Sequence, residues 1–136
     1  MAQHKKQRNR CLVCDVECRW VASIYCTNKC QRDYEYRSYI ERWKKGLEDG
    51  VRSGICTSDY LRRYLFEKFG SKCSRCEWNE VNSFTGLIPL ELHHEDGDFP
   101  NNKEENLDLL CPSCHSLTKF YGSRNNGRGR RKFLAR

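Results

Sequence analysis

The chain has 136 residues, a net charge of +7 and ten cysteines. Hydrophobic residues make up 38% and charged residues 32%, so we expect one compact domain or two small ones, whose thin cores need metal or disulfide staples. No apolar run reaches the roughly 18 residues of a membrane helix, and residues 1–10 lack the apolar stretch of a secretory signal. We therefore expect a cytoplasmic protein, in which paired cysteines bind zinc before they form disulfides.

The first cysteines along the chain predict a zinc knuckle. A Cys-x2-Cys pair is followed by a Cys-x3-Cys pair, and the four thiols are Cys11, Cys14, Cys26 and Cys30. Tetrahedral zinc favours sulfur ligands and can hold together a loop that would not fold alone. Cys18 lies between the pairs and is either an alternative ligand or, as we favour, a free thiol.

Two helices are predicted next. Residues 32–47 have helical periodicity, with an apolar face that we expect in the core: Tyr36, Tyr39, Ile40, Trp43 and Leu47. Glycines at 46, 50 and 54 then indicate a connecting loop. A second helix over residues 58–69 begins with Thr57 or Ser58 as its cap, and its apolar face is Leu61, Tyr64, Leu65 and Phe69. Cys56, just before it, is expected to be a packed thiol.

Two Cys-x2-Cys motifs further along the chain indicate a zinc site more strongly than the first group does. These four cysteines are Cys73, Cys76, Cys111 and Cys114. One zinc bound by all four would join the two ends of the intervening segment. Within that segment the pattern predicts a strand over residues 87–93, a polar loop at 96–102 and a strand over 107–110. A helix over 112–120 follows, with Pro112 in its first turn.

Three histidines and an asparagine gather in the same segment: His93, His94, Asn106 and His115. Neighbours in a strand point to opposite faces, so His93 can bind a divalent cation while His94 faces a water molecule. His115 can complete the metal site, and the Asn106 amide can bond the backbone across the loop. Such a set suits phosphodiester hydrolysis. The alternatives are structural histidines, or a histidine that replaces a cysteine at zinc.

Basic residues are concentrated at the chain ends. Residues 119–136 contain seven cations and no acid. Forked arginine donors suit phosphate oxygens, so contact with nucleic acid is predicted, although a merely solvated tail has the same composition. The residues that we expect to bind DNA are Lys119, Arg124, Arg128, Arg130, Arg131 and Lys132.

The segments LELHHEDGD (90–98), ENL (105–107) and CPSCHSLT (111–118) together resemble the HNH endonuclease family, in particular its small, zinc-stapled, phage-type branch. The resemblance covers about residues 57–130. It implies a ββα-metal fold in which His94 is the general base, His93 and His115 hold the metal, and Asn106 braces the hairpin. Lys119 stands where some relatives have another histidine one helical turn later. Two protein ligands then imply Mg²⁺ or Mn²⁺, with products that carry 5′-phosphate and 3′-hydroxyl ends.

We therefore expect a small zinc-stabilised α+β protein with a ββα-metal, treble-clef-like core preceded by helices and a zinc knuckle. Its predicted domains are a knuckle and helix (1–46), an HNH nuclease domain (47–123) and a flexible basic tail (124–136). The predicted function is metal-dependent DNA cleavage by a monomer or a dimer that forms transiently on DNA, in a bacterial host cell if the gene is a phage gene. A zinc-dependent DNA-binding protein that no longer cuts is the main alternative, and an RNA-binding knuckle is a third.

Overall fold

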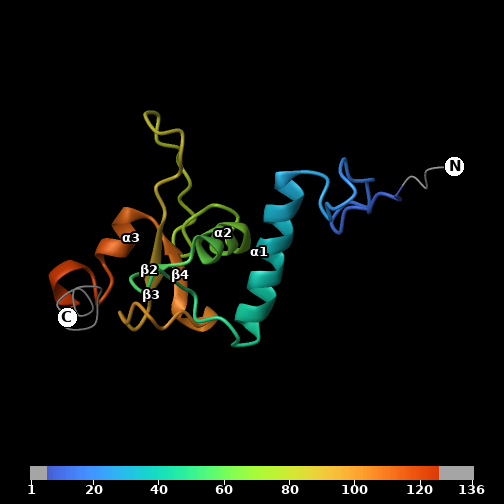
Figure 1. Cartoon of the computed structure of the whole chain (residues 1–136). Helices are drawn as coiled ribbons and strands as arrows, with labels where there is room; N and C mark the ends of the chain where they lie inside the picture. The colour runs from blue at the N-terminus through green and yellow to red at the C-terminus, as the bar shows by residue number, and fades with distance from the viewer. Residues whose placement is uncertain (1–5, 126–136) are drawn as a thin grey trace, which may run out of the picture. The chain divides into compact units, whose positions relative to one another are not determined.

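The structure, a computed structural model, describes residues 6–125 and divides into two compact units, residues 1–42 and 43–136 (Figure 1). It is a small α+β fold, as predicted. The elements in chain order are α1 (Asn28–Lys44), β1 (Val51–Arg52), β2 (Cys56–Thr57), α2 (Asp59–Lys68), β3 (Glu91–His94), the 3₁₀ turn η1 (Glu104–Asn106), β4 (Leu107–Leu110), α3 (Pro112–Ser116) and the 3₁₀ turn η2 (Gly122–Arg124). None of these helices combines the length and apolar character needed to cross a membrane.

The first unit is an irregular knuckle that leads into α1. The Cys11 N–H donates to the Val16 carbonyl at 2.9 Å, and Leu12 is bonded to the Ile24 carbonyl at 3.1 Å. The helix begins at Asn28, four residues before its predicted start. Thr27 explains the earlier start, because its hydroxyl accepts from the Cys30 N–H at 3.2 Å and satisfies one of the unpaired donors of the first turn.

The predicted apolar face of α1 is correct in part. Tyr36, Ile40 and Trp43 are buried. The prediction for Leu47 is wrong: the helix ends at Lys44, and Leu47 is 69% exposed. Gly46 causes the difference, because it turns the chain with a φ of +73° that side-chain-bearing residues disfavour.

The core of the second unit lies between α2 and β4. The Ser58 hydroxyl caps α2 by accepting from the Tyr60 N–H at 3.2 Å, so the predicted second helix is confirmed. Leu61 and Leu65 on its inner face are fully buried, as are Leu109 and Leu110 of β4. This apolar layer supports the strand pair on which the histidines lie.

The β3–β4 hairpin pairs Glu91 with Leu110 and His94 with Leu107 in antiparallel register. β4 has the predicted bounds, but β3 is shorter than predicted and begins at Glu91. Pro89 lacks the N–H that a paired strand needs. The preceding residues instead form a separate excursion, closed by a 2.8 Å bond from the Asn82 N–H to the Leu87 carbonyl, which extends away from α2 and α3 in Figure 1.

α3 is also shorter than predicted, because it ends at Ser116 and not near residue 120. Thr118 accounts for this difference. Its N–H and its hydroxyl both donate to the His115 carbonyl, at 3.1 and 2.8 Å. The carbonyl is thereby satisfied without another helical turn.

The turn around Gly50 offers a test of the packing. Gly50 has a φ of +75°, and a Cβ there would lie 2.6 Å from both Asn102 Cβ and Leu61 Cδ1. Gly54 has a similar φ of +72°, but a Cβ there would meet nothing within 4 Å. Gly50→Ala should therefore be less stable than Gly54→Ala by about 1–3 kcal/mol, the usual cost of overpacking. Denaturant unfolding of both variants with zinc present measures the difference, and equal stabilities would contradict the packing described.

Candidate functional site

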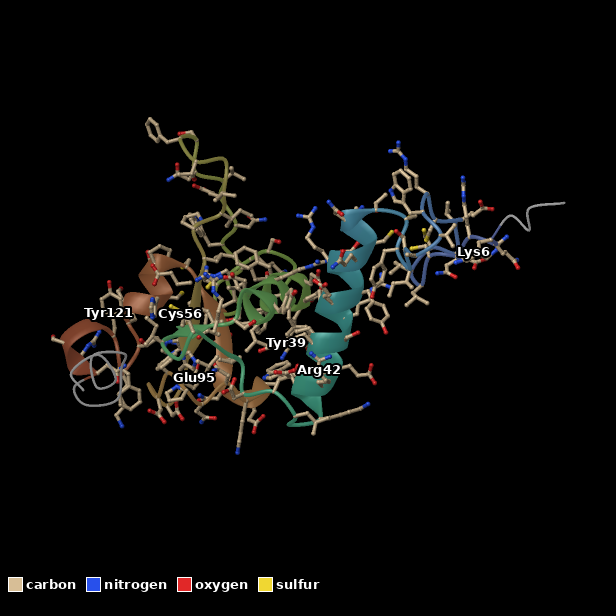
Figure 2. All side chains as sticks on the ribbon, in the orientation of Figure 1. Lys6, Tyr39, Arg42, Cys56, Glu95 and Tyr121 are labelled. Carbon is tan, nitrogen blue, oxygen red and sulfur yellow. The ribbon has the colours of Figure 1, made fainter. Side chains whose placement is uncertain are left out.

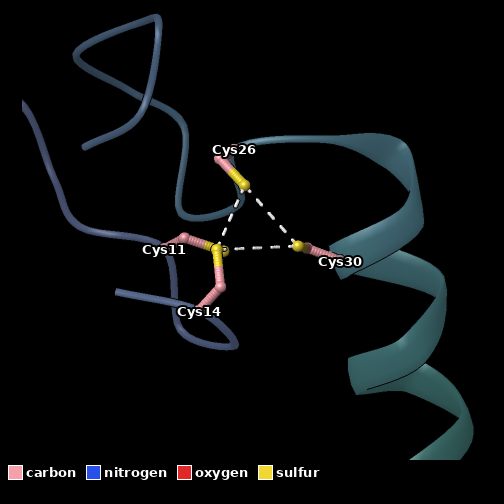
Figure 3. A group of neighbouring side chains, drawn as sticks. All are labelled: Cys11, Cys14, Cys26 and Cys30. Carbon is pink, nitrogen blue, oxygen red and sulfur yellow. Dashed lines mark hydrogen bonds between the residues drawn. The ribbon is translucent and has the colours of Figure 1, made fainter. Parts of the chain in front are cut away.

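The first cysteine group has the geometry of a zinc site. Its four ligand atoms all lie within 4.8 Å of one another, and Figure 3 shows the sulfurs converging from the knuckle and the start of α1. Cys14 Sγ is 3.4 Å from Cys26 Sγ and 3.9 Å from Cys30 Sγ. Four sulfurs at about 2.3 Å from a tetrahedral zinc would lie about 3.8 Å apart. The group can therefore hold a zinc ion with small adjustments.

The second cysteine group joins Cys73 and Cys76 to Cys111 and Cys114, again within 4.8 Å. Cys76 Sγ lies 3.7 Å from Cys111 Sγ. The Ser74 N–H also donates to the Leu109 carbonyl at 2.9 Å, which ties the first pair to β4. Both predicted zinc groups are thus brought together, and in the described part of the chain no other set of three or more ligating side chains is.

The electrostatics of both groups favour a cation. Burial opposes ionisation of Cys11, but backbone N–H groups of Cys26, Val13 and Cys14 outweigh it and lower the pKa of Cys11 to about 6. Hydrogen bonding to Cys14 and Cys30 raises the pKa of Cys26 to about 12.

The second group repeats this division. Burial again opposes ionisation of Cys73, yet backbone N–H groups, that of Cys111 foremost, lower its pKa to about 6, whereas bonding to Cys76 and Cys111 raises that of Cys114 to about 12. Zinc would supply the positive charge that lets the remaining thiols ionise.

The two remaining cysteines lie outside these groups. Cys18 is fully buried, and that burial raises the pKa of its thiol, which agrees with the predicted free thiol. Cys56, in β2, is half-buried and lines the cavity described below.

The cluster of three histidines is built by β3 and α3. The His93 ring, on the buried face of β3, is only 5% exposed, and its centroid lies 5.2 Å from that of His115 at an interplanar angle of 66°. His115 Nδ1 bonds the carboxylate of Glu91, which leaves Nε2 as the nitrogen with the lone pair. Glu91 precedes His93 by two positions and therefore shares its strand face. We had not predicted a contribution from Glu91.

The surroundings of His93 favour a neutral ring. Burial lowers the pKa of His93, and this effect outweighs the opposing influence of Glu95, whose carboxylate is 4.0 Å from Nε2. Arg75 engages the same carboxylate at 3.1 Å. A neutral imidazole is the form that can ligate a metal. Figure 2 labels three residues that help the reader to find this region: Cys56, Glu95 and Tyr121.

His94 points to the other face of β3, where a buried asparagine orients it. Asn102 is 4% exposed, and its Oδ1 accepts from Nε2–H of His94 at 2.9 Å. The Asn102 amide nitrogen donates to the Asp49 carbonyl at 3.1 Å, so its oxygen is directed at His94. This bond selects the tautomer of His94 that carries its lone pair at Nδ1. The sequence predicts only a polar loop at Asn102, because the partners of its side chain are distant in sequence.

Asn106 holds the loop between the strands. Its amide nitrogen donates to the Asn101 carbonyl at 2.7 Å and to Asp96 Oδ1 at 2.9 Å, and its Oδ1 accepts from the Asp96 N–H at 3.1 Å. Both the nitrogen and the oxygen of the amide therefore bond atoms of the loop, so Asn106 bonds the backbone across the loop. It therefore acts on the histidines through the shape of the loop.

The histidines open onto one cavity of about 460 Å³. Its walls come from β1, β2, the start of α2, the β3–β4 loop and the segment after α3. The lining residues with polar or ionisable side chains are Arg52, Cys56, Thr57, Ser58, Asp59, Arg62, His93, His94, His115 and Asn125. The cavity is large enough for a phosphodiester group with a water molecule beside it.

The predicted DNA-binding cations differ in their surroundings. Lys119 is exposed but lies beyond the end of α3, so the expectation that it is one helical turn after His115 is wrong. Its ammonium group lies 5.1 Å from the Phe120 ring centroid. Arg124 donates to the Ser116 carbonyl at 2.6 Å. Four further cations fall outside the described residues: Arg128, Arg130, Arg131 and Lys132.

Two curated proteins are similar to this chain. It is 38% identical over 93 residues to the H-N-H endonuclease F-TflIV of Escherichia phage T5, a match that covers 68% of this chain and 40% of that protein. It is 29% identical over 82 residues to the Zorya protein ZorE of Escherichia coli, covering 60% of this chain and 22% of that protein. The chain therefore spans less than half the length of either relative. No family model and no solved structure matches it.

The second unit thus combines two adjacent histidines, an asparagine bonded to one of them and a four-cysteine group that could hold a metal ion. The identity to the phage T5 protein supports the assignment of this chain to the HNH endonuclease family, in agreement with the motif.

The cysteine groups lead to a prediction about metal content. The native chain should contain about two zinc ions by elemental analysis. Cys73→Ser should release one zinc and unfold the second unit, because metal binding here is part of the folding free energy. Cys56→Ser is the matched control and should retain both ions. A count of one zinc in the native chain would remove the N-terminal group as a metal site.

Proposed function

We propose that this chain is an HNH-type, metal-dependent endonuclease that hydrolyses phosphodiester bonds in DNA. The observation that carries the proposal is the division of labour between adjacent histidines: His93 is buried against His115, while His94 is oriented by Asn102 beside the same cavity. In this proposal β3, β4 and α3 form a ββα-metal unit. The name of the phage T5 relative also supports a nuclease.

In the proposed mechanism His94 is the general base. The Nε2–H bond to Asn102 leaves Nδ1 as the basic nitrogen, which takes a proton from a water molecule near neutral pH. The water oxygen then attacks the phosphorus and the bond from phosphorus to the 3′ oxygen breaks. The departing oxygen takes a proton from solvent, which gives 5′-phosphate and 3′-hydroxyl ends. Asn102 keeps the ring from rotating, so that the lone pair stays directed at the reacting water.

His93 and His115 would hold the catalytic cation. Mg²⁺ or Mn²⁺ bound there would supply Lewis-acid stabilisation of the phosphate charge. The fit rests on the donor set: His93 is kept neutral by burial, and His115 has its Nδ1 engaged by Glu91, which leaves Nε2 for a metal. Water and phosphate oxygens would complete the coordination shell, as expected for hard cations that keep several oxygen ligands.

Both cysteine groups would hold structural zinc. DNA is the proposed substrate, because the chain has a net charge of +7 and its cations are concentrated toward both ends. We retain the proposed organisation of a knuckle and helix at 1–46, a nuclease domain at 47–123 and a basic tail beyond. Each chain has one set of these histidines and would cut one strand unless two chains act together.

The base assignment can be tested with His94→Ala. This variant should lose at least a factor of about 100 in cleavage of plasmid DNA with Mg²⁺ or Mn²⁺, the lower end for a general base, while its affinity for DNA stays nearly unchanged. Near-normal cleavage would exclude His94 as the base. If the native protein binds DNA tightly but never cuts it with either cation, a non-cleaving DNA-binding protein is the correct description.

The role of Asn102 leads to a separate prediction. Asn102→Ala removes the acceptor that selects the tautomer of His94, so the catalytic rate constant should fall by about 10- to 100-fold, as for other orienting partners. Zinc content and the KM for DNA should change little. Asn82→Ala is a control at an asparagine whose side-chain oxygen accepts from the Phe84 and Thr85 N–H groups of its own turn. Equal rates for the two variants would show that Asn102 does not orient the base.

A further inference from the structure

We propose that Arg62 of α2 binds a phosphate group of the DNA strand inside the histidine cavity. The inference rests on the proposed function and names a further substrate contact within it. Arg62 lies one helical turn after Ser58, and both residues line the cavity together with His93, His94 and His115. A helix whose Arg62 precedes His93 and His94 by about thirty positions thus lines the same cavity.

The charges around the cavity single out Arg62. Two arginines and one carboxylate line it, apart from the histidines. Asp59 forms an ion pair with Arg52, and these two charges offset one another. Within residues 6–125, by contrast, the guanidinium of Arg62 makes neither a hydrogen bond nor an ion pair. The lining of the cavity therefore contains one cation that no carboxylate of the lining offsets, together with three histidines.

A phosphodiester is the ligand whose chemistry fits this arrangement. It is a monoanion with two non-bridging oxygens, which match the forked donors of arginine. A solvated arginine of no function would have the same exposure, and the observation that favours a bound phosphate is that Arg62 lines the same cavity as the three histidines. Binding by Arg62 would hold the phosphate in the same cavity as His94, near the water that His94 activates.

The neighbouring residue provides a matched control. Arg63 follows directly in the same helix and does not line the cavity. Its Nε donates to Glu67 at 2.9 Å, one turn further along. Arg62→Ala and Arg63→Ala therefore remove the same group from adjacent positions, one facing the cavity and the other paired at the surface.

The first experiment measures binding without cleavage. The full chain carrying His94→Ala is titrated with duplex DNA at several salt concentrations, alone and combined with Arg62→Ala or Arg63→Ala. Arg62→Ala should weaken binding and reduce the slope of log affinity against log salt by about 0.9, the contribution of one phosphate contact. Arg63→Ala should leave the slope unchanged. Equal slopes for all three proteins, with zinc content unchanged, would overturn the proposal.

The second experiment measures cleavage with His94 intact. Arg62→Ala should lower cleavage by about 10- to 100-fold, the range for loss of a hydrogen bond to a charged group. Arg62→Lys should restore the salt slope while it recovers only part of the rate, because lysine keeps the charge but not the fork. Full activity of Arg62→Ala would contradict the proposal. If the native protein cuts no DNA, the nuclease proposal fails, and the binding experiment still decides whether Arg62 contacts phosphate.

Discussion

The second cysteine group is the constraint on which the rest of the site depends. Cys73 and Cys76 come before β3, whereas Cys111 follows β4 and caps α3, so one metal would join both ends of the segment that carries His93 and His94. The paired strands have only four residues each, and a hairpin of that size is marginal in water. Attachment of α3 to β4 at this group brings His115 beside His93. Metal affinity, folding of the second unit and geometry of the site are therefore parts of one equilibrium.

Two buried amides perform the finer positioning. Asn106 holds the loop between the strands, while Asn102 joins the tip of that loop to His94 and to the carbonyl of Asp49. The Trp43 indole N–H donates to the Asn102 carbonyl at 2.8 Å, so the loop is also held by the end of α1 within the same unit. Such amides are costly to bury unless their groups are satisfied. Their bonds make the orientation of His94 depend on residues about fifty positions earlier in the chain.

The sequence alone predicts α2 and the two cysteine groups, because each depends on a few residues that lie close together in the chain. Ser58 and the spacing of Leu61 and Leu65 define α2, and the paired cysteines are recognisable because two closely spaced pairs can fill a tetrahedral zinc site with sulfur. The spacing of apolar residues alone predicts the start of β3 and the end of α3 wrongly. Pro89 has no N–H for strand pairing, so β3 begins only at Glu91, and Thr118 satisfies the His115 carbonyl, so α3 ends early. Glu91 shares a strand face with His93, which the period-two alternation of a strand is enough to predict. The contact of Asn102 with His94 had no such local signal, since it exists only once the loop has folded against the turn at Gly50.

The pair His93 and His94 shows how one backbone feature can give different chemistry to identical side chains. The two rings have the same intrinsic pKa, and the strand directs them to opposite faces. On one face burial lowers the pKa of His93 and favours its neutral ring; on the other, a hydrogen bond selects the tautomer of His94. If the two environments were exchanged, the proposed base would be buried away from the reacting water, and the proposed metal ligand would be exposed to solvent. Under the proposed mechanism, strand alternation together with Asn102 therefore accounts for the adjacency of two histidines that a single role would not require.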